Sequence, residues 1–297
     1  MTRESRLRFD EVSWANDLAP IELSNSRITT DGDSLLGRLL HNRRVVYSLA
    51  FLKHYADTFN SDFLFFKGDV NFRLSVQTVG ELYLLDLPFL LAGTFFLIKH
   101  RSKTSAVLFA WALLAPVPAA FARETPHALR TLNLLPVPQI IIAVGLAKLS
   151  KLRYPVLICY LLFFIYYLNS YYFIYPTKYA SSWQYGYKQA VQYVAANQFK
   201  YDHISVTDLY GRPYIYFLFY QNYSPQKYWQ SRDISRDWFG FWTVSGFDKL
   251  SFGDSPGKVG RWLYLRGPGQ SPSGAKLLTI VADLSGHPVF EISEKEN

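Results

Sequence analysis

The sequence contains a single cysteine, Cys159, among 297 residues. One cysteine cannot form an intramolecular disulfide, and it cannot supply the ligands of a cysteine-rich zinc site. Charged residues are also scarce, at 18% of the chain, where about 25% is usual for soluble domains. Aromatic residues, also 18%, are too abundant for a disordered chain. The composition therefore indicates a folded protein that lacks a disulfide framework.

Several motifs are missing as well. The sequence has no HExxH zinc motif, no paired histidines at metal-ligand spacing and no GxSxG nucleophile motif. We therefore expect no cofactor, no metal site and no nucleic-acid partner. A signal peptide is also missing, because no apolar stretch follows Arg3, Arg6 and Arg8.

Lysine and arginine are absent from four long apolar blocks. A spanning helix needs about 20 mostly apolar residues, so these blocks predict membrane spans at about 78–98, 104–122, 132–149 and 154–174. The short loops 99–103 and 148–153 hold six basic residues and no acidic residue. The positive-inside rule places these loops in the cytoplasm and both ends of the chain outside.

The fold class predicted from this pattern is an α-helical integral membrane protein, with about four transmembrane helices and a C-terminal extracytoplasmic α/β domain. The predicted domains are an extracytoplasmic segment 1–77, a membrane domain 78–174 and an outer α/β domain 175–297. The expected location is the cell membrane, as a multi-pass protein with extracytoplasmic N- and C-terminal segments. Four uncharged blocks with basic loops between them disfavour the alternative, the buried core of a soluble protein.

The polar segment 1–77 is difficult to export without a signal peptide. The simplest explanation is that the chain is the C-terminal part of a longer membrane protein, and the alternative is true translocation of the N-terminal tail. Within this segment, 34–59 has a helical apolar stripe that Asp33 or Ser34 can cap. This helix would either lie at the membrane interface or pack inside an external domain.

The outer domain shows mixed helical and strand patterns. Helices are predicted at 184–198 and 213–221, and strands at 203–207, 241–245, 261–265, 277–282 and 289–292. Asp208 follows the first predicted strand, where open α/β sheets usually bind ligands, so it is the ligand candidate of this domain. The alternative is an aspartate that only forms a turn before Gly211.

Glu81 and Asp86 lie inside the first predicted span. An ionisable residue within a span is energetically expensive, so both are intramembrane candidates for a functional site. Glu81 is near the outer end and would alternatively reach the membrane interface. Pro88 would weaken the helix beyond Asp86 and leave carbonyl groups free for a cavity.

The loop between the second and third predicted spans is the best candidate for chemistry. It brings Arg123, His127 and Arg130 to the membrane surface. Arginine binds phosphate oxygens bidentately, and the spacing of His127 and Arg130 places both on one face of a helical turn. The three residues therefore predict a lipid-phosphate site. The alternative is a loop whose bases only touch anionic headgroups.

Five stretches of the sequence resemble one group of membrane enzymes. They are FLFFKGDVNFR, GELYLLDLPFLL, WALLAPVPAAFARETPHALRTLNLLPVPQII, WQYGYKQAVQYV and YGRPYIYFLFYQNYSP. The first three resemble the C-terminal half of bacterial polytopic glycosyltransferases of the GT-C superfamily, close to the protein mannosyltransferase and aminoarabinose transferase types. The last two resemble the external C-terminal domain of the same proteins, and the resemblance spans about residues 1–250.

The resemblance implies transfer of a sugar from a polyprenyl-phosphate donor to an acceptor outside the cytoplasmic membrane. It implies direct displacement at the anomeric carbon, with His127 and Arg130 holding the phosphate leaving group. The catalytic acid of such enzymes lies in a first external loop that this sequence does not contain. We therefore expect that the chain alone does not transfer sugar. The expected partners are the lipid-linked donor, membrane lipids and a missing N-terminal catalytic half.

Two other functions stay open at this point. The first is a non-enzymatic four-span envelope protein whose outer domain binds glycan or a protein partner. The second is a transporter subunit, which is weaker because Glu81 and Asp86 are the only acidic residues in the predicted spans.

Overall fold

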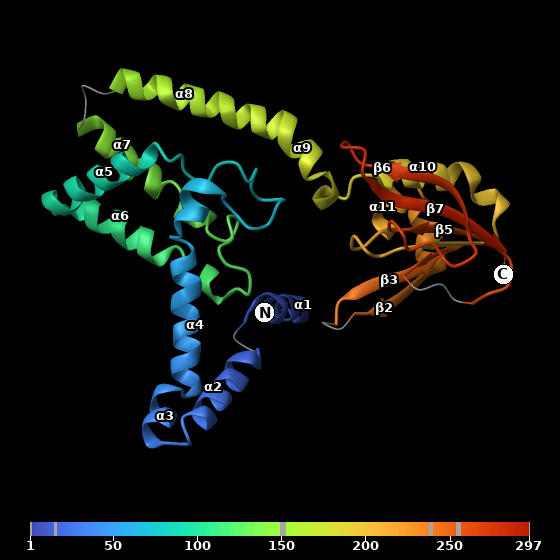
Figure 1. The fold of residues 1–297 in the computed structure, drawn as a ribbon, viewed down its shortest axis with the longest axis horizontal. Coiled ribbons are helices and arrows are strands. Elements are labelled where there is room, and N and C mark those ends of the chain that lie inside the picture. The colour runs from blue at the N-terminus through green and yellow to red at the C-terminus, as the bar shows by residue number, and fades with distance from the viewer. Residues whose placement is uncertain (1, 15–16, 149–152, 238–239, 254–256, 297) are drawn as a thin grey trace. The chain divides into compact units, whose positions relative to one another are not determined.

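The computed structural model describes residues 2–14, 17–148, 153–237, 240–253 and 257–296 (Figure 1). The chain forms two compact units, Met1–Tyr172 and Phe173–Asn297.

The first unit is helical. Its helices are α1 (Arg3–Val12), α2 (Ala19–Thr30), α3 (Leu35–Leu40), α4 (Arg43–Asp57), α5 (Asp86–His100), α6 (Lys103–Leu114), α7 (Val137–Lys148) and α8 (Arg153–Asn169). Short helical turns occur at Asp62–Phe66, Ala119–Phe121 and Leu132–Leu134. Helices α5, α6 and α7 pack side by side, and Leu108, Val137 and Ile141 are buried between them.

Helices α5 and α7 approach each other through glycine. A Cβ atom on Gly93 would lie 1.9 Å from the carbonyl oxygen of Ile141, and one on Gly145 would lie 2.0 Å from that of Phe89. Neither position has room for a side chain. The two backbones are therefore in direct contact, as small residues permit where helices pack closely.

The predicted helix at 34–59 is two helices. Ser34 caps α3 by accepting a hydrogen bond from the Gly37 N–H, as predicted. Asn42 then interrupts the helix, because its side chain donates to the Leu39 carbonyl and accepts from the Val45 N–H at the start of α4. An asparagine that caps a new helix ends the preceding one.

The second unit contains a seven-stranded sheet in the order β2-β3-β4-β1-β5-β7-β6. Strand β1 lies between β4 and β5 and is parallel to both, and the other pairs are antiparallel. The strands are β1 (His203–Val206), β2 (Arg232–Arg236), β3 (Trp242–Phe247), β4 (Leu250–Phe252), β5 (Arg261–Arg266), β6 (Lys276–Ala282) and β7 (Pro288–Glu296). The α-helices of the unit are α9 (Tyr175–Lys178), α10 (Tyr187–Asn197), α11 (Tyr214–Tyr220) and α12 (Pro225–Ser231).

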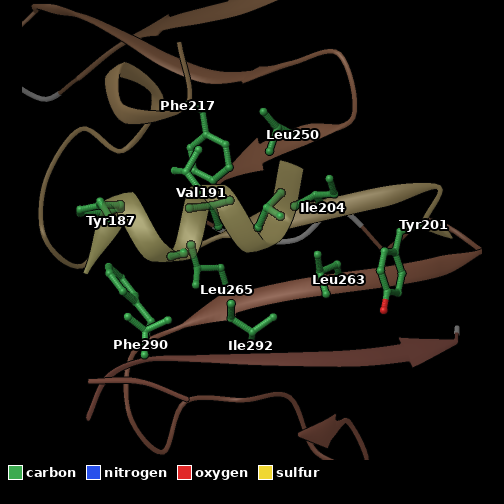
Figure 2. Close-up of a cluster of buried hydrophobic side chains, with 14 of the residues drawn as sticks. Tyr187, Val191, Tyr201, Ile204, Phe217, Leu250, Leu263, Leu265, Phe290 and Ile292 are labelled. Atoms are coloured by element: carbon green, nitrogen blue, oxygen red, sulfur yellow. The ribbon is translucent and has the colours of Figure 1, made fainter. Parts of the chain in front are cut away.

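The core of the second unit lies between the sheet and α10 and α11. Figure 2 shows Tyr187 and Val191 of α10 against side chains of the central strands, and Tyr187 lies 4.8 Å from the Phe290 ring, measured between centroids. Alternate residues of β5, Leu263 and Leu265, point into this core. This alternation is the period-two pattern expected for a strand.

The predicted fold class is wrong. The described residues form a mixed α/β protein with a seven-stranded sheet, instead of a four-span helical membrane protein. Among these residues, two helical segments are long and apolar enough to cross a membrane, Lys103–Phe121 and Tyr154–Lys178.

Local structure explains why the other two predicted spans are too short. In 78–98, α5 begins only at Asp86, because the preceding backbone pairs with the turn Asp62–Phe66 instead of coiling. In 132–149, α7 begins only after Pro136, and the whole apolar helical segment Leu132–Lys148 remains below spanning length. Residues 149–152, which include most of the predicted basic loop 148–153, lie outside the described residues.

The predicted elements of the second unit are confirmed within a few residues. Helices α10 and α11 and strands β1, β3, β5, β6 and β7 lie at the predicted positions. Strands β2 and β4 and helix α12 are not predicted. β4 has three residues, and β2 is the polar edge strand RDISR, so neither carries a strong apolar pattern.

Candidate functional site

The site begins with a backbone pairing that fixes Glu81. The N–H of Glu81 donates to the Phe63 carbonyl at 3.1 Å, and the N–H of Leu82 donates to the Leu64 carbonyl at 2.7 Å. Gly80 permits this approach, because a Cβ atom there would lie 2.4 Å from the Leu64 carbonyl carbon. The Glu81 side chain is consequently held beside the turn that contains Gly68 and Asp69.

Asp69 is the central acid of the site and was not predicted. It is 1% exposed, and its carboxylate accepts hydrogen bonds from the Asn71 N–H at 2.7 Å and from the Ala128 N–H at 2.6 Å. The second bond joins the turn 67–69 to the loop 122–131. The sequence signal was the turn Lys67-Gly68-Asp69, which gives no indication that its aspartate is buried.

His127 faces Asp69 across this junction. Its Nδ1 lies 3.8 Å from Asp69 Oδ2, and this buried nitrogen has no hydrogen-bond partner among the described residues. Burial lowers the pKa of His127, the positive charge of Arg130 lowers it further, and Asp69 and Glu124 oppose the change. His127 is therefore neutral at physiological pH.

Glu81 titrates near neutrality. Its side chain keeps contact with solvent, yet the surrounding protein disfavours the ionised carboxylate. Burial raises its pKa from 4.5 to about 7. The negative charge of Asp69 also raises this pKa, and a hydrogen bond from the Asp69 N–H lowers it in part. A carboxyl group with this pKa can both accept and donate a proton under physiological conditions.

Glu81 lines a cavity of about 580 Å³. The walls are mostly apolar, and the polar groups come from two acids, three tyrosines and Gln139. The lining side chains include Val79, Glu81, Leu82, Tyr83, Asp86, Gln139, Ile142, Ala143, Leu146, Tyr160, Phe164 and Tyr167. Few polar groups in an apolar hollow are typical of small-molecule sites.

Asp86 differs from Glu81 although both line the cavity. Asp86 is buried at the start of α5, where its carboxylate accepts hydrogen bonds from the Tyr83 N–H at 2.7 Å and from the Tyr160 hydroxyl of α8. Both carboxylate oxygens are engaged in holding the structure together. We therefore assign Asp86 a structural role and Glu81 the chemical one.

Arg123 binds the N-terminal segment. Its Nε donates to Asp17 Oδ1 at 3.1 Å, its Nη2 donates to the same oxygen at 2.5 Å, and its Nη1 donates to the Glu11 carbonyl at 2.8 Å. The guanidinium group is occupied by these bonds. Arg123 therefore joins the loop 122–131 to residues 11–17.

Arg130 lies one helical turn beyond His127, as predicted, because its N–H donates to the His127 carbonyl. Its Nη1 donates to the Glu124 carbonyl at 3.0 Å, and its Nη2 lies 3.9 Å from Glu124 Oε2. Arg130 also lines a second cavity of about 260 Å³ next to Phe9 and Phe121. Of the three predicted basic residues, His127 and Arg130 are neighbours, and Arg123 has a different set of contacts.

Asp208 is exposed and lies just beyond the carboxyl end of β1. Its carbonyl accepts a hydrogen bond from the Gly211 N–H at 2.8 Å, so it forms a turn. Gly253, which follows strand β4, lies beside the Asp208 side chain. The next residues, 254–256, lie outside the described residues. Nothing in the described contacts of Asp208 distinguishes a ligand site from a turn.

The described residues contain no group of three or more histidine, cysteine, aspartate or glutamate side chains that could hold a metal ion. Comparison with protein-family models, with curated proteins and with solved structures found no match for the chain. The geometry of the site therefore carries the functional argument.

The raised pKa of Glu81 makes stability depend on pH. Folding favours the protonated carboxyl, so the stabilisation is complete below pH 4.5 and is lost as pH rises through about 7. We expect the free energy of unfolding to decrease over this interval and the Glu81→Gln variant to lack that decrease. Denaturant unfolding of both proteins across this range measures the difference. An identical pH slope in the two proteins would contradict the raised pKa.

Proposed function

We propose that the protein acts at a membrane, held there by the segments Lys103–Phe121 and Tyr154–Lys178. Only 6% of the most apolar stretch of the second segment is buried inside the protein. Its exposed apolar side chains include Leu157, Ile158, Leu161, Leu162 and Ile165. A continuous apolar surface of this kind requires cover by lipid or protein, and the length of the helix suits a bilayer core about 30 Å thick. An extracytoplasmic location of the N- and C-terminal segments stays a prediction.

The activity we propose is transfer of a sugar from a polyprenyl-phosphate-linked donor to an acceptor hydroxyl. The observation that carries this proposal is Glu81, whose pKa is raised to about 7 in the wall of an apolar cavity. Glu81 would accept the proton of the hydroxyl as its oxygen bonds to the anomeric carbon. The bond from that carbon to the phosphate oxygen breaks, and polyprenyl phosphate leaves with the bonding electrons.

The basic loop supports this assignment. Arg130 lies beside His127, His127 faces Asp69, and Asp69 influences the pKa of Glu81. Arg130 lines the smaller cavity and is not part of the lining of the Glu81 cavity, so a donor whose phosphate is held by Arg130 would have to extend past His127 and Asp69 to reach the Glu81 carboxyl. A charge-assisted bond from Arg130 would stabilise the phosphate as negative charge develops on it.

One observation favours a second candidate, a glycan-binding envelope protein. Trp229 and Trp242 are exposed in the second unit, and they stack against Arg232 and Arg236 with guanidinium-to-centroid distances of 3.6 and 4.1 Å. Exposed aromatic rings can stack on sugar rings. This candidate requires sugar binding by the second unit without release of polyprenyl phosphate.

The purified chain in lipid nanodiscs provides the test of the proposed activity. Polyprenyl-phosphate-linked sugars and candidate acceptors are supplied, and released polyprenyl phosphate is measured together with donor binding. The resemblance places the catalytic acid outside this sequence and predicts no transfer by the chain alone. Because we propose Glu81 as the base in its place, we expect release of the lipid phosphate. We also expect Arg130→Ala to weaken binding about ten- to a hundredfold, from the loss of a roughly 1.5–3 kcal/mol contact. Arg73→Ala, at an exposed arginine of the same unit, serves as the matched control.

The outcomes separate the candidate functions. Donor binding without turnover would contradict the proposed transfer activity and would still support the donor-binding site. Equal, small effects of Arg130→Ala and Arg73→Ala on donor binding would show that Arg130 does not bind the donor phosphate. Glycan binding that is lost in Trp229→Ala, without any turnover, would favour the second candidate.

A further inference from the structure

Helix α3 exposes four leucines within six residues. Leu35, Leu36, Leu39 and Leu40 are 87%, 70%, 65% and 58% exposed. Leucine normally lies in a protein core, and contiguous exposed apolar surface marks a site of interaction. Within the first unit, α3 lies at the end of α4 that is remote from α5, α6 and α7 (Figure 1). These leucines therefore have no cover from those helices.

The exposed surface continues along α4. Leu49 and Leu52 are exposed, and at 100° per residue they fall on one face with Val45 and Ala56. An adjacent side of the helix, about 100° from Val45, packs inward through Val46, which is buried. Helix α4 therefore has two apolar faces, of which only one is covered by the protein.

Two basic residues border this apolar face, Arg44 on one side and Lys53 on the other. Both are exposed, and among the described residues no ion pair joins them to an acid. Arg43 lies on the opposite side of α4 from Leu52. Arg38 of α3 lies 3.5 Å from Asp33. An apolar stripe with basic borders is typical of helices that lie in the headgroup region of an anionic bilayer.

Helix α4 contacts one of the proposed spanning segments. The Tyr55 hydroxyl donates to the Leu113 carbonyl at 2.8 Å, at the C-terminal end of α6 and in the middle of Lys103–Phe121. The bond joins the C-terminal end of α4 to this segment, and α3 precedes the other end of α4. The choice of lipid as the occupant therefore rests on the basic residues beside the apolar face and on the membrane location proposed above, and it is independent of the sugar chemistry.

We propose that α3 and the exposed face of α4 form a membrane-surface anchor that inserts its leucines into an anionic bilayer. The leucines of α3 would enter the boundary between headgroups and acyl chains. Arg44 and Lys53 would contact lipid phosphates. The anchor would hold the N-terminal half of the first unit against the membrane.

A fluorescent probe on single cysteines tests the anchor in the full chain. In the Cys159→Ser background, Leu36→Cys carries the environment-sensitive probe NBD, and the protein is reconstituted in vesicles of phosphatidylcholine with phosphatidylglycerol. Lipids with a quencher high on the acyl chain should quench this probe. The matched control is Asn25→Cys on α2, an exposed polar position that should not be quenched.

The native Cys159 provides the second control. It is exposed on Tyr154–Lys178, so its probe reports whether that segment is in the bilayer. Quenching at Cys159 without quenching at Leu36→Cys would overturn the anchor and keep the membrane location. Absence of quenching at both positions would overturn both the anchor and the membrane location.

The two bordering basic residues test the electrostatic part of the proposal. Each of Arg44→Ala and Lys53→Ala should weaken binding of the anchor to anionic vesicles about fivefold, and neither should matter in pure phosphatidylcholine. Equal insertion in both lipids would overturn the role of these residues. A probe at Leu36→Cys that is shielded without lipid, and more so at higher protein concentration, would show a second copy as the occupant and overturn the lipid anchor.

Discussion

Replacement of Glu81 by glutamine is expected to reduce turnover of a polyprenyl-phosphate-linked sugar by roughly 10²- to 10⁴-fold, the usual contribution of a general base. Glutamine keeps the size of the side chain and cannot accept the proton. Donor binding should be nearly unchanged, because the predicted phosphate contact belongs to Arg130. In the wild type, kcat should rise with pH through about 7 as the carboxyl ionises, and the variant should lack this rise.

Two acids nearby serve as controls for that result. Glu124→Gln changes an exposed carboxylate of the loop 122–131 and should leave kcat almost unchanged. Asp86→Asn disturbs the bonds to Tyr83 and Tyr160, so it should lower thermal stability more than it alters the pH profile. If Glu81→Gln retains wild-type kcat and pH profile, Glu81 is not the base.

Replacement of Gly93 by alanine is expected to separate α5 from α7. The added Cβ would lie 1.9 Å from the Ile141 carbonyl oxygen, and backbone atoms cannot move aside as a flexible side chain can. The expected loss is about 3 kcal/mol or more, at or beyond the upper end of the usual cost of overpacking. Thermal unfolding and limited proteolysis in nanodiscs measure the loss.

The second glycine of the contact offers an internal check. Gly145→Ala should destabilise the first unit by a similar amount. The double variant should lose less unfolding free energy than the sum of the two single variants, because moving α5 away from α7 once relieves both clashes. Gly257→Ala, where a Cβ would meet no atom within 4 Å, is the matched control. Full stability of Gly93→Ala would show that the two helices are not in backbone contact.

The strands of the second unit were predictable because their signal is local. β5 contains the continuous apolar run Trp262-Leu263-Tyr264-Leu265, all buried, and a short apolar run of this kind is visible in the sequence. The start of α5 was not predictable in this way. Residues 78–85 are apolar enough for a span, yet Glu81 and Leu82 pair with residues 18 positions earlier in the chain. Apolar composition contains no information about that pairing.

The acids of the site show the same limit. Glu81 and Asp86 were found because charge is rare in apolar sequence, which is a local signal. Their different roles depend on the Tyr160 hydroxyl, 74 positions away from Asp86. Asp69 was missed because its burial depends on the Ala128 N–H, 59 positions later. Long-range hydrogen bonds of this kind are fixed by the fold and leave no spacing pattern.

The bond between Arg123 and Asp17 has a consequence for biosynthesis. The partners are 106 positions apart, and the bond from Trp14 Nε1 to the Ala120 carbonyl spans the same separation. At a translation rate of about 5–20 residues per second, the N-terminal segment would wait roughly 5–20 s for its partners. During that interval the Trp14 ring lacks its final contacts on Phe121. The first unit therefore completes its fold only after the ribosome has passed the loop 122–131, and its N-terminal segment is a natural client for chaperones during synthesis.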